Sequence, residues 1–178
     1  MIKSPSKLNQ SLTALAIALI LSGCASTAPS ANFSKAIAEE EVVDANDSVK
    51  LKIQAQRGVS VAHDDLNRLA IRIGERIDVE RNELGVVNDP RKIEVVVLIT
   101  RYEKGDAMAR AILAGTGQIH IDARVVVKNS ATGELIGDFE IDKTFAWGGI
   151  YGATTSIEDV EEGFADGVAK AVAESSNS

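Results

Sequence analysis

The sequence is almost free of cysteine, since Cys24 is the only one among its 178 residues. A chain with one cysteine forms no internal disulfide, so packing alone must hold its fold. Long hydrophobic runs are missing as well. The apolar stretch at 12–21 is about half as long as the roughly 20 residues that a transmembrane helix needs. The sequence therefore predicts neither a disulfide scaffold nor a membrane-spanning helix.

Common motifs of catalysis and nucleotide binding are also missing. No Gly-x-Ser-x-Gly elbow presents a serine nucleophile. The glycines at 115–117 and 148–149 lack the lysine and the spacing of a phosphate-binding loop, and a dinucleotide-binding fingerprint fails at His120. We therefore predict a protein that is not an enzyme and that holds no cofactor and no metal.

What is present at the amino terminus is typical of a bacterial lipoprotein signal. Lys3 and Lys7 precede the apolar stretch, and small residues lead to Cys24 in the sequence Leu-Ser-Gly-Cys. This order predicts a signal peptide at 1–23 and a lipid on the Cys24 thiol, where each buried methylene adds about 0.8 kcal/mol to membrane binding. Inner-membrane lipoproteins typically carry Asp where this chain has Ala25. We therefore expect the outer membrane, with the protein facing the periplasm.

The mature chain is acidic. Without Lys3 and Lys7, 17 of the 19 basic residues remain against 26 acidic ones, which gives a net charge of −9. A body of this charge repels nucleic acid and anionic lipid head groups. We therefore expect no nucleic-acid partner, and attachment to the membrane through the lipid on Cys24.

Composition divides the mature chain into a tether and one domain. Residues 24–45 are rich in Ser, Ala and Glu and lack a sustained apolar period, so we predict a flexible tether. A single periplasmic domain follows at 46–175, with a short tail at 176–178. A domain of roughly this size buries about two thirds of its unfolded surface, which suffices for one core.

Hydrophobic periodicity predicts the first elements of the domain. Polar and apolar residues alternate at 49–55, as in a strand with one wet face. Apolar residues at three- and four-residue steps over 66–84 predict a helix. The β-branched run at 93–102 predicts an interior strand. A strand, a helix and a strand in this order favour a right-handed parallel crossover.

Two further strands and a helix complete the predicted fold. Alternating residues at 118–128 and 135–145 predict a hairpin, and pairing Arg124 with Glu140 gives both strands the same apolar face. This register turns Lys143 toward the apolar side. With a final amphipathic helix, the predicted fold is α/β (α+β): a two-layer sandwich, β-α-β-β-β-α, with a mixed four-stranded sheet and two helices on one face.

This topology predicts that two loops meet at one end of the sheet. The loop at 103–117 and the segment at 147–155 both leave the sheet there, and the first is unusually apolar for a loop. Two explanations stay open: a short helix folded back on the sheet, or a contact with a partner or a second copy. The candidate partner-binding residues are Tyr102, Met108, Arg110, Trp147 and Tyr151.

The polar sheet face offers an alternative ligand site at His120, Asp122 and Arg124. Here a histidine can meet carboxylates at short range, as a base with its orienting group or as the start of a metal site. A solvated sheet face with alternating charges gives the same residues. The competing hypothesis is therefore a binder of a small molecule or an envelope polymer, or a hydrolase, at this face. A deep cleft would favour it, and a flat exposed face would not.

Five motifs carry a resemblance to a known family. They lie at 101–105, 109–110, 113–115, 118–122 and 143–152. Together they resemble a bacterial lipoprotein family catalogued only as domain of unknown function 4410, over roughly residues 35–173. The resemblance implies an envelope lipoprotein with no established activity and no agreed catalytic residues. Our leading hypothesis is a binding or assembly component that meets another envelope protein, or its own copies, through the loop end of the sheet.

Overall fold

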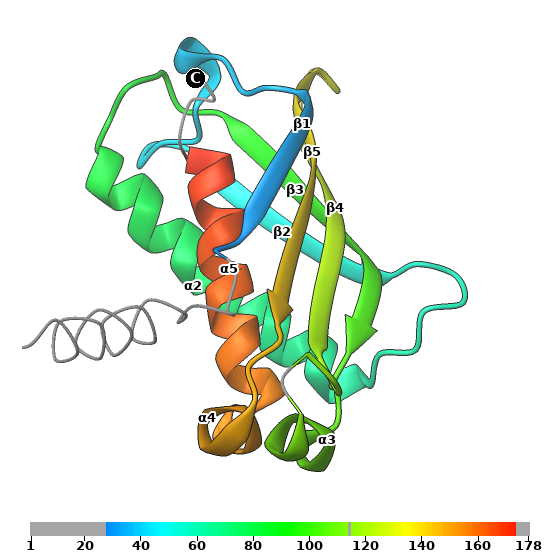
Figure 1. The fold of residues 1–178 in the computed structure, drawn as a ribbon. Coiled ribbons are helices and arrows are strands. Elements are labelled where there is room, and N and C mark those ends of the chain that lie inside the picture. The colour runs from blue at the N-terminus through cyan, green and yellow to red at the C-terminus, as the bar shows by residue number, and fades with distance from the viewer. Residues whose placement is uncertain (1–27, 114, 174–178) are drawn as a thin grey trace, which may run out of the picture.

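Five strands form one mixed sheet, and two long helices lie on one of its faces (Figure 1). The computed structural model describes residues 28–113 and 115–173, so Cys24 and the predicted signal peptide lie outside the described residues. The strands are β1 (Ser30–Lys35), β2 (Ser48–Ala55), β3 (Lys92–Glu103), β4 (Ile119–Asn129) and β5 (Leu135–Phe145). The helices are η1 (Glu39–Glu41, a 3-10 helix), α2 (His63–Leu84), α3 (Ala107–Ile112), α4 (Gly149–Thr154) and α5 (Ile157–Ala173).

The strands follow the order β1-β5-β4-β3-β2 across the sheet. β2 and β3 are parallel and are joined through α2, which confirms the predicted crossover, whereas every other neighbouring pair is antiparallel. None of the helices that the structure describes combines the length and the apolar character of a transmembrane span.

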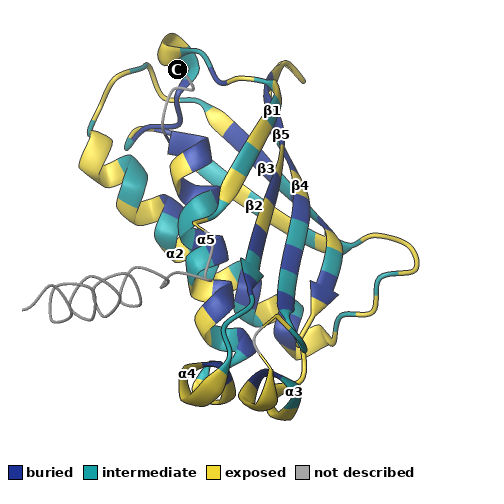
Figure 2. Cartoon of the chain, in the orientation of Figure 1, coloured by how far each residue is buried: buried dark blue, intermediate teal, exposed yellow. Residues whose placement is uncertain are grey.

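The core lies between the sheet and the two long helices (Figure 2). The helices α2 and α5 pack on each other and on the same face of the sheet, as predicted. Burying a large apolar side chain stabilises a fold by about 1.5–3 kcal/mol, so this layer dominates the packing energy. Fully or almost fully buried side chains include Leu69, Ile73, Ile77, Val95, Val97, Val125, Phe139, Phe164 and Val168.

The predicted hairpin register is confirmed. Arg124 lies opposite Glu140, and Val125 lies opposite Phe139. Lys143 also takes its expected inward position on β5 and is 9% exposed. Its aliphatic stem lies against Gly163 of α5, where a Cβ atom would approach Cε to 3.1 Å. This burial lowers the pKa of the Lys143 ammonium group.

The prediction of a flexible tether is wrong for residues 30–45. Ser30–Lys35 forms an edge strand antiparallel to β5, with Ser30 opposite Asp142. The residues after it enter the core, since Ile37, Val42 and Val43 are each at most 5% exposed. The sheet therefore has five strands in place of the four predicted, and the domain begins before residue 46.

Two short helices are present in addition to the two long ones: α3 is the short helix left open for the loop at 103–117, and α4 was not predicted. α3 and α4 lie side by side at the end of the sheet where β3 and β5 finish (Figure 1). The expected meeting of the two loops is thereby confirmed. Both loops are helical where they meet, and this arrangement creates the surface described next.

Candidate functional site

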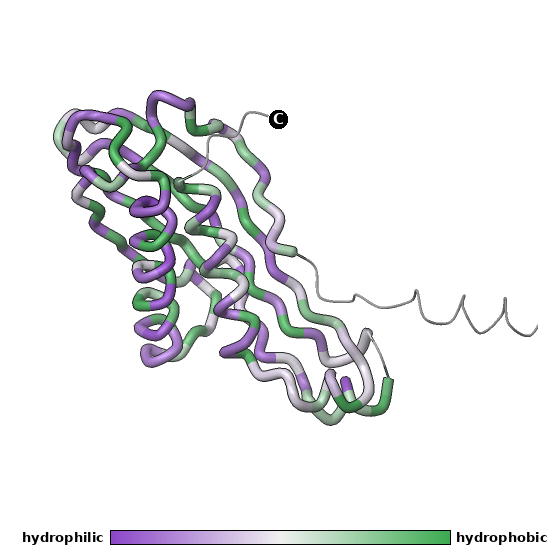
Figure 3. Tube along the Cα trace, turned by 90° about the vertical axis from the view of Figure 1, so that its left-hand side faces the viewer, coloured by the Kyte–Doolittle hydropathy of each residue, from purple (hydrophilic) through white to green (hydrophobic). Residues whose placement is uncertain are grey.

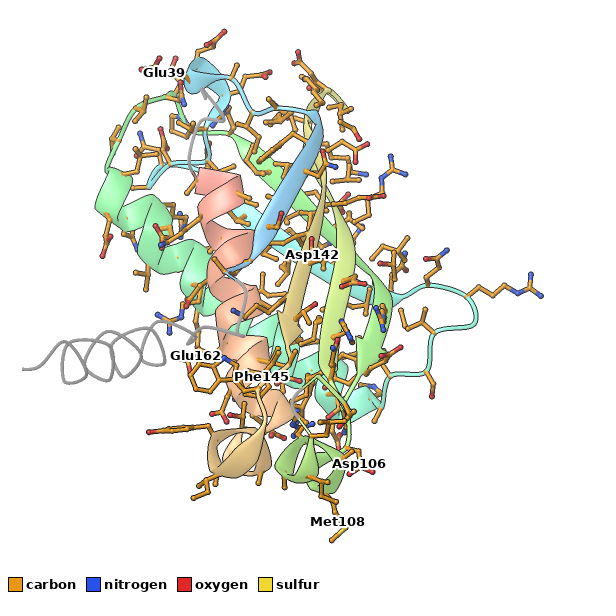
Figure 4. All side chains as sticks on the ribbon, viewed as in Figure 1. Glu39, Asp106, Met108, Asp142, Phe145 and Glu162 are labelled. Atoms are coloured by element: carbon orange, nitrogen blue, oxygen red, sulfur yellow. The ribbon has the colours of Figure 1, made fainter. Side chains whose placement is uncertain are left out.

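The apolar tip is the surface that α3 and α4 present to the outside. It consists of Met108, Ile112, Leu113, Ile150 and Tyr151, whose exposed fractions lie between 60% and 83%. Both helices are mainly exposed in Figure 2, and Met108 projects away from the body of the fold in Figure 4. Other exposed large apolar side chains are spread over α2, the loop after it and the start of β5. The tip is thus a convex apolar surface at one end of the molecule.

Local sequence closes the base of the first loop. The Asp106 carboxylate caps α3 by accepting a hydrogen bond from the Ala109 backbone N–H at 3.0 Å. Gly105 and Gly117 have φ of +66° and +59°. A Cβ atom at Gly105 would lie 2.3 Å from the Gly117 carbonyl oxygen, so only glycine fits there. The two ends of the loop can therefore cross closely and hold α3 outside the sheet.

Arg110 joins α3 to α4. Its guanidinium donates from Nε to the Gly152 carbonyl at 2.8 Å, from Nη1 to Gly117 at 2.7 Å and from Nη2 to Thr155 at 3.0 Å. The planar fork of arginine donors suits three carbonyls that converge from different segments. Sequence reasoning placed Arg110 among the partner-binding residues. The structure buries it to 2% exposure, so it acts as a structural clip inside the tip.

Tyr102 also differs from its expected place. A bulge in β3 between Ile99 and Arg101 shifts the alternation and turns Tyr102 toward the core, where it is 9% exposed. Its hydroxyl donates to Oε1 of Glu161 at 2.7 Å. Burial and then this hydrogen bond raise the pKa of Tyr102. Tyr102 therefore belongs to the interior and does not line the tip.

The remaining aromatic residues form the margin of the tip. Trp147 is half-buried, and its ring meets that of Tyr151 edge to face with centroids 5.6 Å apart. Of the five predicted residues, Met108 and Tyr151 are exposed on the tip. The predicted partner-binding residues did not include Ile112, Leu113 or Ile150, although the loop that holds the first two was recognised as unusually apolar. Their signal in the sequence is the near absence of charge around them.

The polar sheet face holds its predicted residues in separate pairs. Arg124 donates two hydrogen bonds to Asp138, at 2.9 Å and 2.5 Å. This pairing lowers the pKa of the Asp138 carboxyl group. Nδ1 of His120 lies 3.0 Å from Oγ1 of Thr144 on the neighbouring strand. The cation and the imidazole are therefore each engaged with a neighbour across the sheet.

Asp122 lies opposite Asp142 across β4 and β5. Burial raises the pKa of the Asp122 carboxyl group, the nearby Arg101 lowers it, and the charge of Asp142 raises it further. Within 28–113 and 115–173, no three His, Cys, Asp or Glu side chains gather as metal ligands.

A hollow of about 370 Å³ lies on the helix layer, away from this face. It is lined by Arg72, Glu75, Arg76, Val79 and Glu162.

Fold and site together define a two-layer α+β domain whose distinctive surface is an apolar tip. Residues 34–149 match the domain of unknown function DUF4410, and the chain belongs to this family. A search of the curated proteins gave no match.

Solved structures resemble this chain to different degrees, all at low sequence identity. The PelC dodecamer from Paraburkholderia phytofirmans has a TM-score of 0.56 at 6% identity, over 82% of this chain and 99% of that chain. A variant of the same dodecamer has a TM-score of 0.53 at 9% identity, over 83% and 97%. A Xanthomonas campestris protein of family DUF330 has a TM-score of 0.43 at 13% identity, over 78% and 85%. The two PelC structures show the same fold as this chain.

Proposed function

We propose that this chain is a lipid-anchored, non-enzymatic component of the cell envelope that binds or assembles through the apolar tip. The observation that carries the proposal is that five exposed apolar side chains lie together on α3, α4 and the residue after α3. Monomeric soluble proteins rarely expose such contiguous apolar patches unless the patch has a binding role. The tip is therefore the contact surface of the protein.

The lipid anchor is supported by the sequence at Cys24. A charged start, a short apolar stretch and small residues before the cysteine agree with a lipoprotein signal. Ala25 after the cysteine favours the outer membrane, with the domain on its periplasmic side. Strand β1 starts six positions after Cys24, at Ser30. The short connection keeps the folded domain close to the membrane surface.

Assembly from several copies is supported by the fold neighbours. The PelC chains, which share this fold over nearly their whole length, form dodecamers. A second copy of this chain is therefore a natural partner in the envelope. Lateral assembly of anchored copies is favoured because the lipid confines them to one surface and raises their effective concentration.

A role without catalysis is supported by the polar sheet face. Arg124 is paired with Asp138, and His120 meets Thr144, so neither side chain is left to act on a substrate as the competing hypothesis requires. Arg124 and Asp138 satisfy each other across the strands, whereas Asp122 lies opposite another carboxylate, Asp142. This pattern is that of a solvated sheet face.

Photo-cross-linking in intact cells tests the proposed contact surface. A photoreactive residue replaces Met108 or Tyr151 in the full-length protein, and the matched control replaces Ile71, which is 61% exposed on α2. We expect adducts from both tip positions, to lipid or to protein, and none from Ile71. Equal yields at all three positions, or no adduct from the tip, would contradict the proposal.

A further inference from the structure

We infer that the apolar tip inserts into the interfacial region of the bilayer that holds the lipid on Cys24. The inference rests on the proposed anchor and names the partner of the tip: a lipid surface. Four features of the described residues carry it. They are the place where the chain enters the fold, the charge of the tip, the hydrogen bonding of its backbone and its aromatic margin.

The chain enters the fold near the tip. Ser30 pairs with Asp142, and β5 ends three residues later at Phe145. At about 3.3 Å per residue, Ser30 therefore lies about 10 Å along the strand from the tip end of the sheet. β1 then runs away from the tip, since Lys35 pairs with Asp138. The entry point belongs to the half of the sheet that carries the tip.

The length of chain before Ser30 limits how far the fold can lie from the lipid. Ser30 lies six positions after Cys24, and this connection spans at most about 20 Å when fully extended. The tip end of the sheet lies at about half that distance from Ser30. An anchored domain with its tip toward the membrane therefore places α3 and α4 at the bilayer surface. The turn at 129–133 lies at the far end of β5 and faces away.

The five side chains of the tip carry no charge, and the exposed Asp106 carboxylate lies at the start of α3, where it caps the helix. Residues 146–155 contain no charged side chain, and residues 107–113 contain one, the buried Arg110. The tip end of the molecule is mostly white to green in hydropathy, whereas the outer side of α2 is largely purple (Figure 3). Charged groups are costly in a bilayer, and an acidic body is repelled by anionic head groups. The uncharged tip is the end of this acidic protein that can enter lipid.

Side chains within the tip satisfy several of its backbone carbonyls. Helix ends normally leave their last carbonyls to water, and lipid offers no replacement for that water. Here Thr116 Oγ1 donates to the Ala109 carbonyl at 2.8 Å, and Thr155 Oγ1 donates to the Tyr151 carbonyl at 2.9 Å. Arg110 satisfies three further carbonyls from its buried position. This internal pairing is a requirement for a surface that leaves water.

Aromatic residues at the margin of the tip suit the membrane interface. Tyr151 is 71% exposed and stacks edge to face on Trp147. Tyrosine and tryptophan favour the head-group level because one part of the ring system is apolar and another is polar. The convex shape agrees with this partner, since fluid lipid adapts to a protrusion without a matching cavity.

Site-specific fluorescence on vesicles tests the inference. Cys24 is the only cysteine of the chain, so acylation leaves Met108→Cys or Ile150→Cys as the single free thiol for a polarity-sensitive fluorophore. Ile71→Cys on α2 is the matched control, since Ile71 is also well exposed, at 61%. The acylated full-length proteins are reconstituted into vesicles of phosphatidylethanolamine and phosphatidylglycerol, with or without nitroxide-labelled lipid.

We expect the fluorescence emission of both tip labels to shift to shorter wavelength on vesicles, and nitroxide-labelled lipid to quench it. The label at Ile71→Cys should show neither effect. Ile112→Asp with Leu113→Asp should abolish quenching of the label at 150, whereas Val86→Asp, at a control position that is 66% exposed, should not. Two results would overturn the inference: tip labels whose emission stays at the wavelength of the control label, or tip labels whose emission shifts to shorter wavelength without quenching by nitroxide-labelled lipid. The second result would mean a protein contact and would leave the proposed contact surface standing. Thiol labelling of the unsubstituted protein at Cys24 would overturn the anchor itself.

Discussion

Nε of Arg110 donates to the carbonyl oxygen of Gly152 at 2.8 Å, and this bond joins α3 to α4 across 42 positions of sequence. The same guanidinium holds the carbonyls of Gly117 and Thr155. One buried side chain thus ties together every segment that builds the apolar tip. The exposed apolar residues of the tip are therefore held in place by the fold itself, through the hydrogen bonds of the buried Arg110 guanidinium.

Replacing this clip should loosen the tip. Arg110→Leu removes three charged hydrogen bonds, and bonds to charged groups contribute about 1.5–3 kcal/mol each, although not additively. We expect the free energy of unfolding to fall by about 2–4 kcal/mol. Urea denaturation measures the loss, and hydrogen exchange should speed up within 107–112 and 149–154. The control Arg101→Leu breaks an exposed pair with Glu103 and should cost at most about 1 kcal/mol. Equal losses in the two variants would argue against the clip.

Two glycines of the same loop should differ in their tolerance of a side chain. A Cβ atom at Gly105 would lie 2.3 Å from the Gly117 carbonyl oxygen, whereas at Gly115 nothing lies within 4 Å. Both have positive φ, so Gly115→Ala adds backbone strain of about 1 kcal/mol. Gly105→Ala adds a backbone clash to that strain. Thermal unfolding should show a clearly larger loss for Gly105→Ala, and similar melting temperatures would contradict the close crossing of the loop.

The acid dependence of stability should include a contribution from Glu94. Its carboxylate accepts from Lys128 at 2.8 Å and pairs with Lys52, and these contacts lower its pKa from 4.5 to about 2. A lowered pKa in the folded state stabilises the fold above the unfolded value, and the stabilisation is lost as the pH falls from about 5 to 2. Urea midpoints across this range should be less dependent on pH in Glu94→Gln. The double variant Lys52→Met with Lys128→Met should show the same flattening. If the urea midpoint of Glu94→Gln varied with pH as steeply as that of the unsubstituted protein, the proposed contribution of Glu94 would be wrong.

A buried hydroxyl and an exposed one provide a further comparison. The Tyr102 hydroxyl donates to Glu161, a fully buried carboxylate that Arg68 also binds, whereas Tyr151 is exposed on the tip. Tyr102→Phe should lower the free energy of unfolding by about 1.5–3 kcal/mol, because the acceptor is charged. Tyr151→Phe should change it by at most about 0.5 kcal/mol. Chemical denaturation of both variants measures the difference. If Tyr102→Phe left the free energy of unfolding unchanged, the hydrogen bond from Tyr102 to Glu161 would not stabilise the fold.

Much of the sheet could be predicted from the sequence because its strands alternate strongly. The pairing of Arg124 with Glu140 followed from two apolar faces that agree in a single register. The edge strand β1 gave no such signal. Only Ala31 and Phe33 supply apolar contacts along Ser30–Lys35, and its partner β5 lies about a hundred positions further along the chain. Pairing at that sequence distance decides the structure of the segment, and local composition does not show it.

The position of the candidate site at one end of the sheet could be predicted from the sequence, but only some of the residues that line it could. Topology brought the two loops to one end of the sheet, as expected. The bulge after Ile99 reversed the direction of Tyr102, and strand periodicity alone does not show a bulge. Arg110 was predicted to contact a partner because the topology brings its loop to the end of the sheet, yet it is buried and donates to three carbonyls. A bulge decided the place of Tyr102, and hydrogen bonds to distant carbonyls decided that of Arg110, and a single sequence displays neither.

The membrane role of the tip depends first on the lipid at Cys24, and the mass of the amino-terminal peptide measures that lipid most directly. The protein is purified from cell membranes without added tag at its amino terminus and is digested for mass spectrometry. For a lipid-anchored protein we expect a peptide that begins at Cys24 and carries a thioether-linked diacylglycerol. A peptide with a free Cys24 thiol, or one that still contains the residues before it, would rule out the lipid anchor.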